Sequence, residues 1–424
     1  MANLPAPPPP SGRQVLADRS IAAVLLATFA AASAAILQAV ALGKLVYDLT
    51  GRPVDLGFLG LAEFLPTAVL VLVTGSVADR FDRRLVGAIA MGGEVLTAVG
   101  LLVYVRSGNT ALWPILSIVV LFGVARGFAA PAVRALAPSV APPGSLPRVV
   151  AFSSMSWQAA AIVGPVLGGF LYAANPWLAF LAAAALFAVA VAAMPLVRLR
   201  VNPSAVARTE RPSVRAAFEG LRVLRRTPVL FGAISLDLFA VLFGGAVALL
   251  PAIAKDRLGV DAVGLGWLRA AGGIGASLTG VALAIRPLQR HVGKVLLVGV
   301  GIFGVATMLL GVTHSFLVAV IALAVLSGAD MVSVFVRGTI VPLATPDAVR
   351  GRVLAVEAVF IGASNELGAF ESGVAAQLLG TSAAIVSGGA ATLLIVAVWW
   401  LAFPAIRNID RFSELEQDPS QGRK

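Results

Sequence analysis

The chain has 424 residues, of which 59% are hydrophobic and only 12% are charged, and its formal net charge is +11. A soluble domain carries about twice that share of charged residues, because its surface must face water. The composition excludes an ordinary soluble protein. Because there is no cysteine, it also excludes disulfides, thiolate metal sites and cysteine nucleophiles.

Residues 1–17 are rich in proline and lack the cleavage pattern of a signal peptide, so we predict a disordered cytoplasmic tail there. The two histidines, His291 and His314, do not have the spacing of metal ligands, and we expect neither a metal nor a cofactor. A nucleophile–base pair is equally hard to build from such a composition, and we therefore expect no enzyme.

Twelve apolar segments follow, each long enough to cross about 30 Å of hydrocarbon as a helix. We predict an all-α integral membrane protein in two six-helix halves, 18–197 and 229–405, joined by a basic cytoplasmic linker at 198–228 and followed by a cytoplasmic tail at 406–424. The spans are expected near 20–43, 55–78, 85–105, 112–136, 150–173, 177–197, 229–254, 262–285, 292–311, 316–343, 353–380 and 383–405.

The cations predict the orientation, since cytoplasmic loops are enriched in lysine and arginine. If both termini are cytoplasmic, cytoplasmic segments hold 24 of the 32 cations, outer segments hold five, and three lie within spans. This placement explains the net charge as a topology signal and an attraction to anionic lipid, and it argues against nucleic acid as a partner. We expect a multi-pass protein of a bacterial cytoplasmic membrane, and a monomer.

The halves show an internal repeat. Pro138 and Arg148 recur as Pro342 and Arg352 at an offset of 204 residues, and the same offset places Gly169 over Gly373. Matches at one offset, in equivalent parts of two six-span halves, indicate a duplication. Duplicated halves are the usual construction of a transporter that rocks around a midplane site.

The loop after the second span carries a glycine, an Asp-Arg pair and a double arginine: Gly75, Asp79, Arg80, Arg83 and Arg84. This arrangement resembles the signature between helices 2 and 3 of the major facilitator superfamily, whose fold has twelve helices in two pseudo-symmetric halves. The resemblance implies a cytoplasmic gate that latches the halves together. The alternative is a positively charged cytoplasmic loop with one acid.

Two further motifs carry the resemblance. Arg126 matches the helix-4 arginine of the superfamily, and at that depth it requires a partner or water. Span 5 contains a glycine-proline motif like that of the antiporter branch, in which small residues permit close helix packing and proline permits bending. Its residues are Gly164, Pro165, Gly168 and Gly169. A structural ion pair for Arg126 and a packing role for the motif remain alternatives.

The second half resembles the branch of the superfamily that holds the enterobactin exporter and macrolide-efflux proteins. The residues behind this resemblance include Asp237, Gly244, Gly245, Arg269, Arg337 and the segment Ser364 to Gly373. The resemblance runs from about residue 15 to 405 and implies secondary-active export by alternating access. No P-loop is present that could support ATP-driven transport.

Buried carboxyls are candidates for proton coupling, because keeping an ionisable group in the membrane is costly and a carboxyl there can bind and release a proton. The candidates are Asp237 and Asp330, then Glu366 and Glu371. Their expected charge partners are Arg126, Arg269 and Arg337, and helix-to-helix structural pairs are the alternative for each acid. Glu357 is assigned to the cytoplasmic gate around Arg352.

The expected substrate is an amphipathic small molecule, a siderophore or a drug, exchanged for protons. Candidate cavity residues are Gln38, Trp157, Gln158, Phe239 and Asn365, each of which could instead serve helix packing. A non-transporting membrane scaffold or sensor, or a facilitator-type importer, is the alternative function. A scaffold has no need of so many intramembrane charges.

Overall fold

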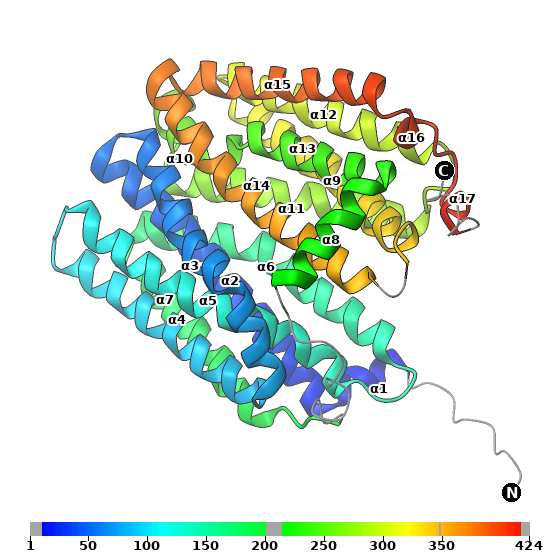
Figure 1. Cartoon of the computed structure of the whole chain (residues 1–424). Helices are drawn as coiled ribbons and strands as arrows, with labels where there is room; N and C mark the ends of the chain where they lie inside the picture. The colour runs from blue at the N-terminus through cyan, green and yellow to red at the C-terminus, as the bar shows by residue number, and fades with distance from the viewer. Residues whose placement is uncertain (1–10, 201–213, 347–348, 417–424) are drawn as a thin grey trace, which may run out of the picture.

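A computed structural model describes residues 11–200, 214–346 and 349–416; within these ranges the side chains of 71–73, 75–76, 78–80, 214–218 and 416 are not described. Every regular element in this part of the chain is helical, and twelve helices are long and apolar enough to cross a membrane. The twelve spans predicted from the sequence are confirmed. Figure 1 shows them as two bundles that pack side by side.

The first half is built from α2 (Arg19–Thr50), α3 (Pro53–Arg80), α4 (Arg83–Arg106), α5 (Leu112–Val140), α6 (Leu146–Ala174) and α7 (Pro176–Ala193). The second half is built from α9 (Pro228–Phe243) with its continuation η3 (Ala246–Leu249), α10 (Leu250–Ala252) and η4 (Ile253–Arg257), then α11 (Ala262–Ile285), α12 (Val292–Val312), α13 (Phe316–Leu343), α14 (Arg350–Leu379) and α15 (Thr381–Ala402). Shorter helices are α1 (Gly12–Ala17), η1 (Met194–Leu196), α8 (Val214–Arg226), α16 (Pro404–Arg407) and α17 (Ser413–Glu416).

Local sequence explains where the spans begin and end. Pro53, Pro176 and Pro228 occupy the first helical position, where proline loses no helix hydrogen bond. Asp82 and Asp261 cap α4 and α11 by accepting hydrogen bonds from backbone N–H groups. The first span extends beyond its expected end at residue 43 to Thr50, and it stops at Gly51, which takes a left-handed conformation at φ 61°.

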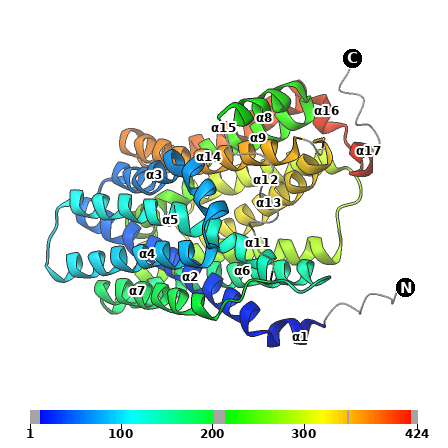
Figure 2. The same ribbon diagram turned by 60° about the horizontal axis from the view of Figure 1, so that its bottom comes forward.

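The first and last described helices, α1 and α17, both lie toward the right of Figure 1, α1 beside the lower bundle and α17 beside the upper one, and Figure 2 shows both from a second side. We call the side that carries α1, α8 and α17 the terminal face, and the opposite side, which carries Gly51 and Gly380, the far face. The bounds of the spans agree with this division, because an even number of crossings returns the chain to its starting side.

The predicted repeat has a structural counterpart. A Cβ added at Gly169 of α6 would lie 2.4 Å from the carbonyl oxygen of Ala262, at the start of α11, and one at Gly373 of α14 would lie 3.0 Å from that of Pro53, at the start of α3. Equivalent glycines thus allow equivalent helix pairs from opposite halves to meet near the far face. Small residues at such crossings let backbones approach closely.

The seventh span is broken, which the sequence analysis did not predict. Helix α9 ends at Phe243, and a Cβ at the following Gly245 would lie 2.5 Å from the carbonyl oxygen of Gly368 in α14. Beyond the break the chain continues through a 3-10 turn and a π-helical turn that ends at Arg257. π-helical turns are uncommon and often mark functional positions.

Two segments outside the predicted spans contain helices, and the disorder predicted for residues 12–17 of the tail is wrong. In the linker, α8 packs against α9 and α14, because Leu224 joins Leu230 and Val353 in a buried cluster while Arg225 and Arg226 remain exposed. In the N-terminal tail, α1 is capped by Ser11, and its Val15 is 1% exposed. The predicted tail residues 1–10 and 417–424, and linker residues 201–213, lie outside the described residues.

Candidate functional site

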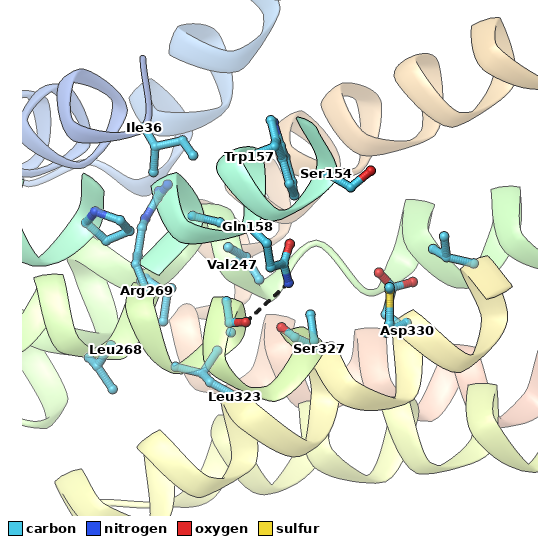
Figure 3. Close-up of a pocket in the computed structure, with 18 residues that line it drawn as sticks. Ile36, Ser154, Trp157, Gln158, Val247, Leu268, Arg269, Leu323, Ser327 and Asp330 are labelled. Atoms are coloured by element: carbon cyan, nitrogen blue, oxygen red, sulfur yellow. Dashed lines mark hydrogen bonds between the residues drawn. The ribbon is translucent and has the colours of Figure 1, made fainter. Parts of the chain in front are cut away.

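A cavity of about 600 Å³ lies between the halves. It is lined by α2 and α6 from the first half and by η3, α10, α11 and α13 from the second (Figure 3). Its walls are largely apolar, with Trp157 and Leu268 among the side chains, and its few polar groups include Gln158, Ser154 and Ser327. The Gln158 amide donates to the carbonyl oxygen of Gly273 at 3.4 Å, across the boundary between the halves. Size and lining are typical of a small-molecule site.

Two charged residues line this cavity, Arg269 of α11 and Asp330 of α13. Figure 3 shows them toward opposite ends, with Gln158 and Ser327 between. Arg269 lies nearer the far face and Asp330 nearer the terminal face, because α11 and α13 both run from the far face to the terminal face.

A buried charge triad lies next to the cavity. The Arg337 guanidinium is 2.7 Å from an Asp237 carboxylate oxygen and 3.6 Å from one of Glu357, so the triad ties α13 to α9 and α14. All three side chains are buried. A small hollow lined by Asp237, Asp330 and Ser333 lies between the triad and the Asp330 wall of the main cavity.

The triad identifies the partners of Arg337 and modifies one expectation. Arg337 pairs with the acids of two other helices and not with Asp330, which lies two turns away on its own helix. Glu357 was assigned to a cytoplasmic gate around Arg352, but its described ionic partner is Arg337. Arg352 pairs with Glu219 of α8 at 2.5 Å, so it connects the linker helix to α14.

The first half has its own intramembrane pair. Arg126 of α5 lies 3.4 Å from Glu94 of α4, whose carboxyl is fully buried and whose second oxygen has no hydrogen-bond partner. Glu63 of α3 lies within electrostatic range of both Arg126 and Arg269.

Glu366 of α14 points toward α3, since a Cβ at Gly60 would lie 2.8 Å from a Glu366 carboxylate oxygen. Glu371 accepts a hydrogen bond from the adjacent Ser372 at 3.4 Å.

Three expected cavity residues lie elsewhere. Gln38 is 1% exposed inside the first half, where neither amide atom has a hydrogen-bond partner. Phe239 packs its ring against Trp399 of α15, with centroids 5.7 Å apart, and Asn365 donates to the carbonyl oxygen of Ile361 within its own helix. The predicted cavity lining is thus found at Trp157 and Gln158. Periodicity alone does not say which face of a buried helix meets the cavity.

The glycine-proline motif of α6 lies in two interfaces. Gly164 and Gly168 face the backbone of α2, Gly169 faces α11, and Pro165 lines the cavity. The motif therefore packs α6 between the two halves, beside the cavity.

The loop motif can be followed in part. Arg83 donates to the Ser139 hydroxyl of α5 at 3.2 Å, and Arg84 donates to the carbonyl oxygen of Val197 and pairs with Asp82 at 2.6 Å. These contacts join helices within the first half. The predicted latch depends on Gly75, Asp79 and Arg80, and the side chains of Asp79 and Arg80 are not among those that the structure describes.

A cluster of charged residues at the far face is not among the site residues predicted from the sequence. Lys255 Nζ lies 3.2 Å from Asp48, and the Tyr47 hydroxyl donates to Asp256, so two contacts join the end of α2 to η4 of the other half. Lys44 also pairs with Asp48, at 2.6 Å, but within α2. The sequence does carry a signal for this cluster, because an acid lies near the end of the first span of each half, Asp48 and Asp256, beside the cations of the outer segments.

Comparisons with known proteins agree with this architecture. A family model described as a transmembrane secretion effector matches residues 13–421. An uncharacterised MFS-type transporter of Bacillus subtilis is 29% identical over 274 residues, which cover 62% of this chain and 61% of that protein. The enterobactin exporter EntS of Escherichia coli is 28% identical over 292 residues, 67% of each chain. Macrolide efflux protein A of Streptococcus pyogenes is 28% identical over 216 residues, 49% of this chain and 52% of that one.

Solved structures show the same fold at low identity. A POT family transporter in complex with 5-aminolevulinic acid has a TM-score of 0.72 at 12% identity and covers 92% of this chain and 97% of its own. A bacterial homologue of the human lysosomal transporter Spinster, inward-facing and unoccupied, has a TM-score of 0.72 at 14% identity and covers 95% and 99%. The chain therefore belongs to the major facilitator superfamily, in the family of transmembrane secretion effectors, and is a membrane transporter rather than an enzyme.

Proposed function

We propose that this chain exports an amphipathic small molecule in exchange for protons, and that Asp330 carries the proton. The observation behind this proposal is that Asp330 borders both the ligand-sized cavity and the small hollow that it shares with Asp237. The charge of a single carboxyl in that position can respond both to what the cavity contains and to the charge state of the triad.

The chemistry of coupling follows from the charges around Asp330. It lies within electrostatic range of Asp237 and Arg337, so a proton on Asp330 removes one negative charge beside the triad. The attraction that Arg337 exerts on the helices carrying its two acids then changes, and with it the relative energy of two arrangements of α9, α13 and α14. A ligand or proton shifts such an equilibrium by its differential affinity for the two states.

The positive-inside distribution supports placing both termini in the cytoplasm and the far face outside. On this assignment the structure is closed to the outside, where α3 meets α14, α6 meets α11, and Asp48 meets Lys255. In the proposed cycle a proton from outside loads Asp330 in the outward-open state, favours the inward-open state, and leaves as substrate binds.

The direction of transport is proposed from the relatives. Two of them are named for export or efflux, one of enterobactin and one of macrolides. A siderophore or a drug is therefore the proposed cargo, and a bacterial cytoplasmic membrane the proposed location, with a single chain as the transporting unit.

A direct test is proton release by the purified protein in weakly buffered detergent with a pH indicator. Iron-free siderophores and macrolides are added one at a time, and at least one compound is expected to release protons. Release should disappear in Asp330→Asn and persist in Asp410→Asn, which makes the same change in a partly exposed carboxyl at the terminal face, outside the membrane spans. The absence of release by every compound would contradict antiport and favour a scaffold or a facilitator-type importer.

A further inference from the structure

The two charges on the cavity wall differ in their surroundings from the intramembrane arginines Arg337 and Arg126. Among the described residues, Arg269 and Asp330 take part in no ion pair and no side-chain hydrogen bond. Arg337 and Arg126, by contrast, each have a carboxylate within ion-pair distance. An arginine in the membrane interior that lacks such a partner is costly, and intramembrane charges of this kind mark substrate pathways.

Arg269 is built into the boundary between the halves. A guanidinium nitrogen lies 4.0 Å from where a Cβ at Gly43 of α2 would be, and Nε is buried without an acceptor. Glu63 is within electrostatic range but does not form an ion pair with it. The guanidinium therefore keeps its planar array of donors available at the far end of the cavity. Such an array matches a carboxylate or phosphate better than any other side chain does.

The opposite end of the cavity carries the opposite charge. A Cβ added at Gly280 of α11 would contact Met331 of α13, the residue after Asp330. Asp330 therefore lies close to the level of Gly280. Arg269 is thus about three turns nearer the far face, roughly 15 Å at 1.5 Å per residue. Between them lie the indole of Trp157 and aliphatic side chains of both halves. A ligand is offered a donor array at one end, an apolar wall in the middle and an acceptor at the other end.

We propose that the molecule bound in this cavity carries an anionic oxygen group, a carboxylate, phosphate or phenolate, which Arg269 binds at the far end while the apolar body lies along Trp157. Asp330 fixes the orientation, because an anion at its end would meet the like charge of the ionised carboxylate. The inference concerns the cavity of the proposed exporter and names the class of its substrate. It rests on the proposed function only in taking this cavity as the transport site.

Matched fluorescent probes test this at equilibrium, without any gradient. The probes are dansylglycine, its neutral amide dansylglycinamide and the cation dansylcadaverine, titrated into wild-type protein in nanodiscs with empty nanodiscs as the blank. Wild type is expected to bind dansylglycine more tightly than the amide. Arg269→Gln is expected to weaken dansylglycine about tenfold or more, the size expected for a lost charge-assisted hydrogen bond, and to change the amide less than about twofold.

Two variants control for structure and for charge. Arg269→Lys keeps the cation and should retain part of the preference for dansylglycine. Arg106→Gln removes an arginine that stacks on Trp177 away from the cavity, and should leave that preference intact. The proposal is overturned if wild type binds dansylglycine no better than the amide, if it prefers dansylcadaverine, or if Arg269→Gln weakens both probes equally.

The same data separate this inference from the proposed function. Arg269-dependent binding of dansylglycine by a protein that releases no protons would support the anion site and contradict antiport. Proton release on binding only cationic or neutral compounds would support antiport and overturn the anion site.

Discussion

Lys255 Nζ lies 3.2 Å from an Asp48 oxygen, and this ion pair joins the first membrane helix of one half to the first of the other at the far face. Lys44 contacts the same carboxylate from within α2, so one acid has a partner on each side of the boundary. The Lys255 ammonium also lies 5.6 Å from the centre of the Tyr47 ring. Only the contacts that cross between halves have to break when the far face opens.

Lys255→Gln is expected to favour the far-open state, and Lys44→Gln is the matched control. A partly exposed ion pair is worth about 0.2–1 kcal/mol, so the open population should rise by a factor of about 1.4 to 5. Because the chain has no cysteine, Ser327→Cys supplies a single label in the cavity without further changes. The measurement is the rate of labelling by an impermeant maleimide from the far side. Equal acceleration by both lysine variants would contradict a latch between the halves.

The triad predicts a large stability effect at Arg337. Arg337→Gln leaves two buried carboxyls without their cation, and breaking a buried pair from one side costs about 3–5 kcal/mol. Neutralising all three residues together should recover most of that loss. Thermal unfolding followed by tryptophan fluorescence checks both statements. If Arg337→Gln unfolds at the wild-type temperature, the triad does not stabilise the second half.

The two acids of the triad should differ. Asp237 is 2.7 Å from the guanidinium and Glu357 is 3.6 Å away, so Asp237→Asn should lower the unfolding temperature more than Glu357→Gln. The reverse order, in the same fluorescence measurement, would show that the longer contact is the stronger one.

The loop before α4 predicts a pH-dependent effect. The Arg84 side chain hydrogen bonds to Asp82 and holds the pKa of that carboxyl below its ordinary value of 3.8. A pKa that is lower in the folded state means that the stabilisation is complete above the unfolded-state value and is lost as the pH falls through the folded-state value. Asp82→Asn should therefore lower stability at neutral pH, by less than about 1 kcal/mol because the pair is well exposed.

Unfolding temperatures of wild type and Asp82→Asn across the acid range check this. The difference between the two unfolding temperatures should shrink as the pH falls through the folded-state pKa of Asp82. Asparagine can also cap the helix, so the substitution removes the charge and keeps the cap. A difference that stays constant with pH would contradict a stabilising role of the Asp82 charge.

The sequence predicted the spans because hydrocarbon thickness imposes a length and a composition that can be read locally. It also predicted Trp157 and Gln158 at the cavity. The partners of Arg337 could not be predicted, because Asp237 and Glu357 are far from it in sequence and meet only through packing of three helices. The same holds for Asp48 and Lys255, whose pairing depends on how the two halves dock.

Helix α8 shows a different limit. The arginines of this segment predict a polar linker, although Leu221 and Leu224 share a face at helical spacing. Only the packing of α9 and α14 against that face shows that it is buried. The break after Phe243 could have been expected from Gly244 and Gly245, but the reason for it, close contact with Gly368, lies in another helix.

The most direct test of the central claim is proton movement coupled to transport in proteoliposomes that hold a pH gradient. The substrate is the compound that releases most protons from purified protein, and internal pH is followed with a trapped indicator during its flux. Wild type and Asp410→Asn should move protons opposite to the compound, and Asp330→Asn should lose gradient-driven flux while still exchanging the compound across the membrane. Undiminished gradient-driven transport by Asp330→Asn would contradict the account.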